Sequence, residues 1–292
     1  MRSEKDVLAG PVRWPRNMAA DNAGSIHDDK TAAALGFRGG TVAGSIHMDQ
    51  FPPLLIDAFG PRWFEAGSLS LYFRNATTDN EPVQAFVQRP PAGATDVQVR
   101  AWAASSDVIV AEGTAGAGRP AEISALRGRD LRPVDPSELR MLRQLKPGQS
   151  LGELRTTASG ERMQASIRAG AMTEPLDWYT GASPWGGPIA SPSAVVDLLF
   201  GRLLAGTREK MGPHVGLFGA IEIRFHHGPV LIGHSYTVTG EVVAVSQTPK
   251  TEVLWFDSRA VDADGVVIAE MRMMSRQMKQ SSQLYQDQGA AG

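Results

Sequence analysis

Two segments of the chain follow one pattern, and this internal repeat restricts the possible folds more than any other feature of the sequence. Residues 21–59 contain a polar start, a short amphipathic helix, a glycine turn and a longer apolar helix. Residues 173–200 are a weaker copy, in which GGPIASP aligns with GGTVAGS at an offset of 147 residues. Because that offset is close to half of the 292-residue chain, the repeat indicates two copies of one domain.

The first copy is expected to contain two helices followed by strands. Helical spacing of apolar residues predicts helices at 30–35 and 44–59, and the proline pair at 52–53 either kinks the second helix or marks the start of its regular part near Gln50. A short edge strand is expected at 12–14. Alternating segments bounded by turn residues predict further strands at 68–74, 82–88, 97–103 and 108–114.

The second copy repeats this order. A helix is expected at 192–205. Strands are expected at 151–157, 162–169, 220–225, 236–244, 252–261 and 266–276. The segments LSLYFR and IEIRFH, which begin at Leu69 and Ile221, provide a second alignment of the copies.

A helix followed by antiparallel strands, twice in one chain, predicts an α+β double hot-dog fold. In each repeat a curved antiparallel sheet wraps a central helix, and we expect the two sheets to join edge to edge because this removes two exposed edges. We assign residues 1–118 to an N-terminal repeat that carries the site and 119–146 to a connector with one short helix. Residues 147–278 form a C-terminal repeat that is expected to be non-catalytic, and 279–292 a flexible tail.

The composition excludes several classes of function. A net charge of −2 and a pI of about 6.3 argue against a nucleic-acid-binding protein, which needs a concentrated basic face. The chain has no cysteine, which excludes disulfides, thiolate nucleophiles and iron–sulfur clusters. There is no signal-peptide pattern and no apolar run of the roughly 18 residues that a membrane span needs. We therefore expect a soluble cytoplasmic protein that binds neither nucleic acid nor membranes.

The segment SIHDDKTAAALGFRGGTVAG, residues 25–44, resembles a known family. It is similar to the segment of MaoC-like (R)-specific enoyl-CoA hydratases/dehydratases that reads roughly D-x-N-P-I-H-x-D, an alanine-rich helix, and G-F-x-x-x-I-A-H-G-M. Here IHDD matches I-H-x-D, GF matches the helix exit, and VAGS falls on the I-A-H-G-M position. Residues 221–242 resemble the strand pair that follows the central helix in this family. The resemblance implies a hot-dog fold and an acyl thioester, such as acyl-CoA, as substrate.

The resemblance also implies roles for particular residues. In the family an aspartate and a histidine bracket a water and the β-carbon of the acyl thioester, and a backbone N–H at the start of the central helix holds the thioester carbonyl oxygen. The histidine corresponds to His27 and the helix-start glycine to Gly44. The aspartate position, five residues before the histidine, is Asn22. Asparagine cannot accept a proton as a general base, so the dyad is altered unless Asp21, Asp28 or Asp29 takes its place.

Each candidate has a structural alternative. An imidazole titrates near neutrality, so His27 is the leading acid/base candidate, although it could instead cap a helix or bond a backbone carbonyl. Asn22 could orient a water or a substrate carbonyl, or simply occupy a turn. Asp29 could be a helix-start charge. Gly44 and Ser45 offer N–H groups to a developing oxyanion, although a glycine in a turn needs no chemical role.

Further positions could bind substrate. His47 could face the same cleft as the leading candidate, or the helix surface. Arg38, Arg62 and Arg74 could contact an anionic carrier, or be ordinary surface arginines. No HxxEH-type spacing supports a metal site, so we expect neither a metal nor a cofactor.

The second repeat has no histidine in the matching segment. The offset of 147 places Glu174 at the position of His27. Trp178, Tyr179 and Trp185 could line an apolar pocket there, but we favour a repeat that has lost catalysis and keeps a structural role.

Three functions stay open. The first is a lyase, a hydratase/dehydratase that acts by acid/base chemistry on acyl-CoA or a related activated acyl substrate. The second is a hot-dog acyl-CoA thioesterase in which an acidic residue activates water. The third is a noncatalytic subunit that binds a hydrophobic ligand or serves an assembly. The oligomeric state also stays open, with a homodimer as one option.

Overall fold

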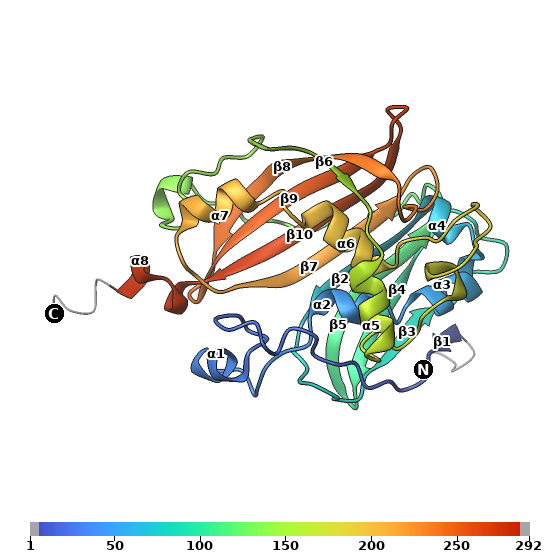
Figure 1. Ribbon diagram of the computed structural model, residues 1–292, viewed down its shortest axis with the longest axis horizontal. Helices are drawn as coiled ribbons and strands as arrows, with labels where there is room; N and C mark the ends of the chain where they lie inside the picture. The colour runs from blue at the N-terminus through green and yellow to red at the C-terminus, as the bar shows by residue number, and fades with distance from the viewer. Residues whose placement is uncertain (1–5, 287–292) are drawn as a thin grey trace.

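One ten-stranded antiparallel sheet carries the fold of the computed structural model, which describes residues 6–286 (Figure 1). Its order is β1-β3-β4-β5-β2-β7-β10-β9-β8-β6, so the second half of the chain repeats the strand order of the first half in reverse. The two half-sheets join edge to edge through β2 and β7, as expected. The strands are β1 (Val7–Ala9), β2 (Gly67–Phe73), β3 (Gln84–Gln88), β4 (Val97–Ser105), β5 (Val108–Ala117), β6 (Ser150–Thr157), β7 (Gly216–Phe225), β8 (Ser235–Gln247), β9 (Thr251–Val261) and β10 (Val267–Met278).

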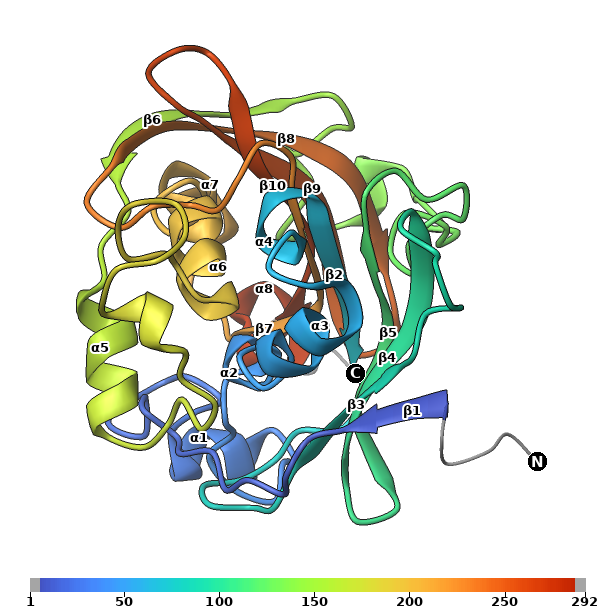
Figure 2. The ribbon, with the colours of Figure 1, turned by 90° about the vertical axis from the view of Figure 1, so that its right-hand side faces the viewer.

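Short helices lie on the concave side of the sheet, which curves around them (Figure 2). In the first repeat α3 contacts β3 and β5, and in the second α6 contacts β9 and β10. No helix within residues 6–286 is long and apolar enough to cross a membrane. The helices are α1 (Asp29–Ala34), α2 (Gly44–Met48), α3 (Pro52–Phe59), α4 (Trp63–Ala66), α5 (Glu161–Arg168), α6 (Pro192–Phe200), α7 (Ala205–Met211) and α8 (Gln283–Gln286), with 3-10 turns η2 (Pro136–Glu138), η3 (Asp177–Tyr179) and η4 (Lys279–Ser281).

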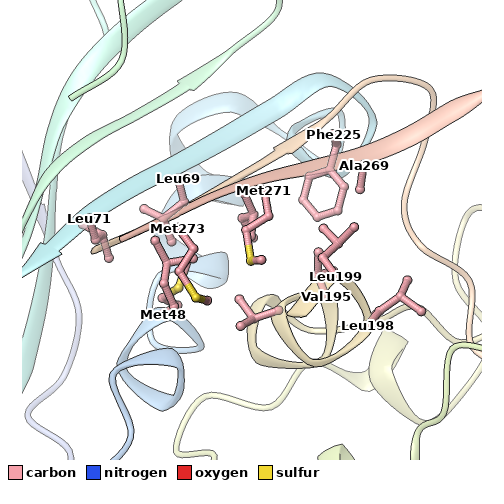
Figure 3. Packing of buried hydrophobic residues seen from close by; sticks show 14 of the residues in the cluster. Met48, Leu69, Leu71, Val195, Leu198, Leu199, Phe225, Ala269, Met271 and Met273 are labelled. Carbon is pink, nitrogen blue, oxygen red and sulfur yellow. The ribbon is translucent and has the colours of Figure 1, made fainter. Parts of the chain in front are cut away.

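A continuous apolar core fills the space between the sheet and the helices (Figure 3). The central strand β2 is buried along nearly its whole length, because strands flank it on both sides and a helix layer covers it. Side chains of both repeats belong to the same buried cluster, so the repeats share one core rather than having two. Figure 3 shows Met48, Leu69, Leu71, Val195, Leu198, Leu199, Phe225, Ala269, Met271 and Met273 in this cluster.

The seam between the half-sheets is short. Its five residue pairs run from Ser68↔Arg224 to Tyr72↔Ala220. Beyond Tyr72 and Ala220, β2 is paired only with β5 and β7 only with β10, each within its own repeat. The sheet therefore divides at one end of the seam.

The proline pair separates two helices rather than kinking one. Pro52 and Pro53 occupy the first two positions of α3, where a missing N–H group leaves no helical hydrogen bond unmade. The helix predicted at 192–205 is also shorter, since α6 ends at Phe200 and α7 follows as a separate helix.

Two predicted strands are wrong. The segment 162–169 is helix α5, in which Met163 and Ile167 are four residues apart and share one helix face. Over so short a segment, alternation and helical spacing fit the same apolar residues. The edge strand is β1 rather than 12–14, where Arg13 forms an isolated bridge.

The connector packs against the outer, convex face of the sheet, across the seam. The Leu126 N–H donates to Ser70 Oγ of β2 at 3.0 Å. Arg127 forms an ion pair with Glu222 of β7 at 3.3 Å. Leu126 itself is fully buried. This segment therefore covers the joint between the two repeats.

The described part of the predicted tail is bonded to the sheet. Lys279 Nζ donates to Gln247 Oε1 at 2.8 Å, and the Tyr285 hydroxyl donates to the Glu252 carboxylate. The remainder of 279–292 lies outside the described residues.

A buried polar contact joins the helices of the two repeats. Asp49 follows α2, and its Oδ1 accepts from the Ser193 N–H in the first turn of α6 at 2.9 Å. Its Oδ2 is buried and has no hydrogen-bond partner among the described residues. Burial raises the pKa of Asp49 to about 7, against the opposing effect of the bonds from Ser193.

We predict that Leu126→Ala lowers the free energy of unfolding by about 2–5 kcal/mol, because it leaves a cavity at a fully buried position. The matched control is Ile123→Ala in the same connector, where the side chain is 69% exposed and a change within about 0.5 kcal/mol is expected. Urea unfolding measures both variants. Equally small effects would show that the connector is not part of the folded core.

The raised pKa of Asp49 leads to a prediction for Asp49→Asn. The folded protein retains the proton of this carboxyl up to about pH 7, whereas the unfolded chain loses it near pH 4. The stability that this proton contributes is complete below about pH 4 and is lost as the pH rises to about 7, by up to about 1.4 kcal/mol per pH unit. Asparagine does not titrate. The stability of the variant relative to wild type should therefore rise across this range in urea unfolding, and a pH-independent difference would contradict the raised pKa.

Candidate active site

A cavity of about 1110 Å³ lies between the two repeats, where the sheet divides. One wall is formed by the loop before α1, the start of α2 and the chain after β2. The opposite wall comes from α7, the beginning of β7 and the end of β10. The lining residues lie mainly within 22–27, 35–37, 41–47, 73–77, 211–219, 248–251 and 275–278.

His27 lines this cavity, and its ring is fixed through one nitrogen. Nδ1 lies 2.7 Å from the carbonyl oxygen of Thr41. A carbonyl oxygen can only accept, so Nδ1 carries a proton and, in the neutral ring, Nε2 is the free acceptor. Within residues 6–286, Nε2 has no hydrogen-bond partner. The structure thus places His27 at a cavity, and its catalytic role stays a prediction.

The loop that positions His27 is held by its own hydrogen bonds. The Thr41 N–H donates to the Ile26 carbonyl at 2.9 Å, which closes the loop next to the imidazole. The Gly40 N–H donates to Asp29 Oδ1 at 2.6 Å. Asp29 therefore braces the loop, and its side chain is not part of the cavity lining.

Gly44 begins α2 at the cavity wall. The N–H groups of a first helical turn have no intrahelical acceptor, so the amide of Gly44 is available to a ligand. A Cβ at this position would lie 2.9 Å from the Phe73 ring, so only glycine allows this close approach. Ser45 follows in the same turn but does not line the cavity.

His47 also lines the cavity but has a different environment. It is 2% exposed, and its Nε2 lies 2.8 Å from Thr77 Oγ1. Burial lowers the pKa of His47 to about 4, so the ring is neutral at pH 7. Its Nδ1 is buried without a partner among the described residues. A neutral ring with an unused nitrogen can hold a polar substrate atom but cannot supply a charge.

Asn22 and Arg38, the remaining two candidates, differ in whether they line the cavity. Asn22 lines the cavity, and its side chain makes no hydrogen bond within residues 6–286. Arg38 does not line it, because its guanidinium group binds the Glu81 carboxylate at 2.9 Å and the carbonyl of Ala76.

The cavity lining contains cations and no acid. Among the described residues, none of those that line it is an aspartate or a glutamate. No group of three or more potential metal ligands occurs within residues 6–286. The charged or titratable side chains in the lining are His27, His47, Arg74, Arg162, Arg208, His214, Lys250 and Arg276.

Hydrogen bonds at the glycine turns correct the alignment of the repeats. The Thr41 N–H bonds the Ile26 carbonyl in the first repeat, and the Ile189 N–H bonds the Trp178 carbonyl in the second. The two turns are therefore offset by 148 residues, not 147. The carbonyls that these turns bond, Ile26 and Trp178, are 152 residues apart (178 − 26), so Glu174 is not the counterpart of the catalytic candidate.

Tyr179 takes the place of His27 in the second repeat, since it follows the paired carbonyl. It is fully buried, and its hydroxyl has no hydrogen-bond partner among the described residues. Trp178 and Trp185 pack edge to face, with ring centroids 5.6 Å apart, and none of these aromatic side chains lines the cavity. The second repeat thus contributes a packed cluster at this position rather than a pocket.

Sequence reasoning missed the second wall of the cavity. Phe200, Phe218 and Arg276 come from α6, β7 and β10 and lie opposite the loop of the first repeat. They form no motif, because the pairing of β2 with β7 brings them to the site. The one sequence feature that pointed to this wall was Arg276, at the end of a predicted strand, and an arginine there does not by itself indicate a site.

Solved structures share this architecture at low sequence identity. A protein named as a MaoC domain dehydratase from Chloroflexus aurantiacus J-10-fl matches with a TM-score of 0.60 and 13% identity, over 93% of this chain and 94% of that one. RV0216 from Mycobacterium tuberculosis, which has a double hot-dog fold, matches with a TM-score of 0.57 and 13% identity, over 93% and 96%. A MaoC-like dehydratase matches with a TM-score of 0.52 and 14% identity, over 94% and 98%. No family model and no curated protein matches the sequence.

Likeness at this level of identity establishes the fold. It confirms, at the level of architecture, what the resemblance of residues 25–44 implied. The chain has the double hot-dog fold that MaoC-like dehydratases of known structure also have.

Proposed function

We propose that this protein is a MaoC-like hydratase/dehydratase that acts by acid/base chemistry on an acyl thioester such as acyl-CoA. The observation that carries the proposal is the state of His27. One ring nitrogen is fixed by the Thr41 carbonyl, and the other is an acceptor at the wall of a cavity, with no partner among residues 6–286. A ring held in this way can accept a proton through Nε2 without first breaking a bond to the protein.

In the hydration direction Nε2 of His27 accepts a proton from water while the water oxygen bonds to the β-carbon of a 2-enoyl thioester. The electron pair of the double bond moves toward the carbonyl, whose oxygen gains negative charge. The N–H of Gly44 donates to that oxygen and stabilises the enolate. The imidazolium then returns the proton to the α-carbon, so one water has been added and the ring is neutral again.

Asn22 lies at the same cavity and takes the place of a carboxylate. Its amide can orient the attacking water but cannot remove its proton. Because no carboxylate of the described residues lines the cavity, the proton transfers are left to the imidazole. The same observation argues against a thioesterase with an acidic general base, and release of free thiol from acyl-CoA would distinguish that activity.

The apolar part of the cavity suits an acyl chain. Phe200, Leu204 and Phe218 form an apolar wall that the second repeat supplies. In this arrangement the first repeat carries out the acid/base chemistry, and the second repeat contacts the acyl chain of the substrate.

We predict that His27→Gln lowers kcat/KM for hydration of trans-2-enoyl-CoA by about 10²- to 10⁴-fold, since it removes the acid/base group. The control is His227→Gln. His227 Nδ1 also bonds a backbone carbonyl, that of Val267 at 3.0 Å, but His227 does not line the cavity. The assay uses panels of 2-enoyl-CoA and 3-hydroxyacyl-CoA substrates. Unchanged turnover in His27→Gln would remove the role assigned to it.

A second prediction concerns the amide at the start of α2. Gly44→Ala forces the methyl group against the Phe73 ring, which shifts the first turn of α2 and should lower kcat/KM by about tenfold or more. Gly187→Ala serves as the control, because nothing lies within 4 Å of the added atom. Equal activity of the two variants would show that the position of this amide does not matter for turnover.

A further inference from the structure

Three guanidinium groups gather on the outer face of the sheet, where β2 and β7 separate. The Cζ atoms of Arg74 and Arg129 lie 5.0 and 5.4 Å from the ring centroid of Tyr72, so the two groups are no farther apart than the sum of these distances. Tyr72 belongs to the apolar cluster that the connector covers. Arg276 on β10 is near enough to both arginines for their charges to act on it.

Among the described residues, acidic side chains neutralise only one member of this cluster, which consists of Arg74, Arg129 and Arg276. Glu112 pairs with Arg74 at 2.9 Å. Arg129 and Arg276 form no ion pair within residues 6–286. Other acids on this face already have cationic partners: Asp130 pairs with Arg132, Glu222 with Arg127, Asp257 with Arg127 and Arg272, and Glu270 with His226.

Holding these three arginines close together costs free energy when no ligand is bound. Nε of Arg276 is buried and has no hydrogen-bond partner among the described residues. A buried charged donor without a partner costs free energy, and like charges held close together repel one another. Burial, and then the charges of Arg74 and Arg129, lower the pKa of Arg276. A bound anion would relieve both costs.

The cluster is continuous with the candidate active site. Arg74 and Arg276 line the cavity that also contains His27, and within residues 6–286 that lining has no carboxylate that would repel an anion. Planar guanidinium groups bind phosphate oxygens through paired N–H donors. Arg129, the third arginine of the cluster, belongs to the connector, so the segment between the repeats would take part in binding.

We propose that Arg74, Arg129 and Arg276 form a binding site for a phosphate group at the mouth of the cavity. The assignment of its source rests on the proposed function: the phosphate belongs to the carrier of the acyl thioester. A carboxylate on the acyl group has the same charge chemistry and is the alternative source of the anion.

Isothermal titration calorimetry of the full chain with pyrophosphate tests the site itself. We expect binding to wild type that weakens with added NaCl, and about tenfold or greater weakening in Arg129→Gln and Arg276→Gln. Arg129 is exposed, so its substitution should leave the fold intact. The matched control is Arg100→Gln, because the exposed Arg100 also lies over an aromatic ring, 4.6 Å from the Trp102 centroid, but outside the cavity.

Two further titrations identify the source of the anion. Tighter binding of 4′-phosphopantetheine than of pantetheine, lost in Arg129→Gln, assigns the carrier phosphate. Equal binding of these two, with tighter binding of glutaryl-pantetheine than of pentanoyl-pantetheine, assigns an acyl carboxylate. Either result supports an anion site.

The site is refuted if pyrophosphate does not bind, or if Arg100→Gln weakens binding as much as Arg129→Gln does. His27→Gln separates this outcome from failure of the proposed function. That variant should bind pyrophosphate like wild type, whether or not the wild-type protein hydrates enoyl thioesters.

Discussion

The antiparallel pairing of β2 with β7 determines both the stability of this molecule and the location of its cavity. Five residue pairs join the half-sheets, and the buried faces of these strands belong to one core. The same pairing ends after Tyr72 and Ala220, and each strand then continues only with its own repeat. A longer seam would close the gap that the cavity occupies, and a shorter one would expose sheet edges.

The two repeats contribute different chemical groups to the cavity. The first supplies the first-turn amide of α2 and an imidazole with one nitrogen that has no partner in the described part of the chain. The second supplies apolar side chains and cations from α7, β7 and β10. At its own equivalent position the second repeat has Tyr179, which is fully buried beside Asp49. The position of His27 in the first repeat therefore faces the cavity, whereas the equivalent position in the second repeat is occupied by the buried side chain of Tyr179.

The sequence predicted what depends on local patterns. Helix caps, turn residues and alternation located nine of the ten strands approximately and the short helix near His27. Helix α5 was missed because Met163 and Ile167 fit either periodicity, and the repeat offset was wrong by one residue because glycine turns align at more than one register. The acidic Asp29 could not be assigned from its neighbours, since its role is a bond to Gly40 eleven residues later.

The cations opposite His27 are a non-local feature. Arg276 and Arg129 lie far from the motif in sequence, and only strand pairing and the path of the connector bring them close to Arg74. No local pattern distinguishes them from surface arginines. This is why residues 25–44 could be used to predict side chains of the first wall, whereas the cations of the second wall could not be predicted.

The most direct test of the account is a crystal structure with an unreactive 2-enoyl-CoA analogue. The carbonyl oxygen of the analogue should lie at about 2.7–3.1 Å from the Gly44 nitrogen, with Nε2 of His27 one water away from the β-carbon. A ligand bound elsewhere, or an imidazole turned away from the acyl group, would contradict it.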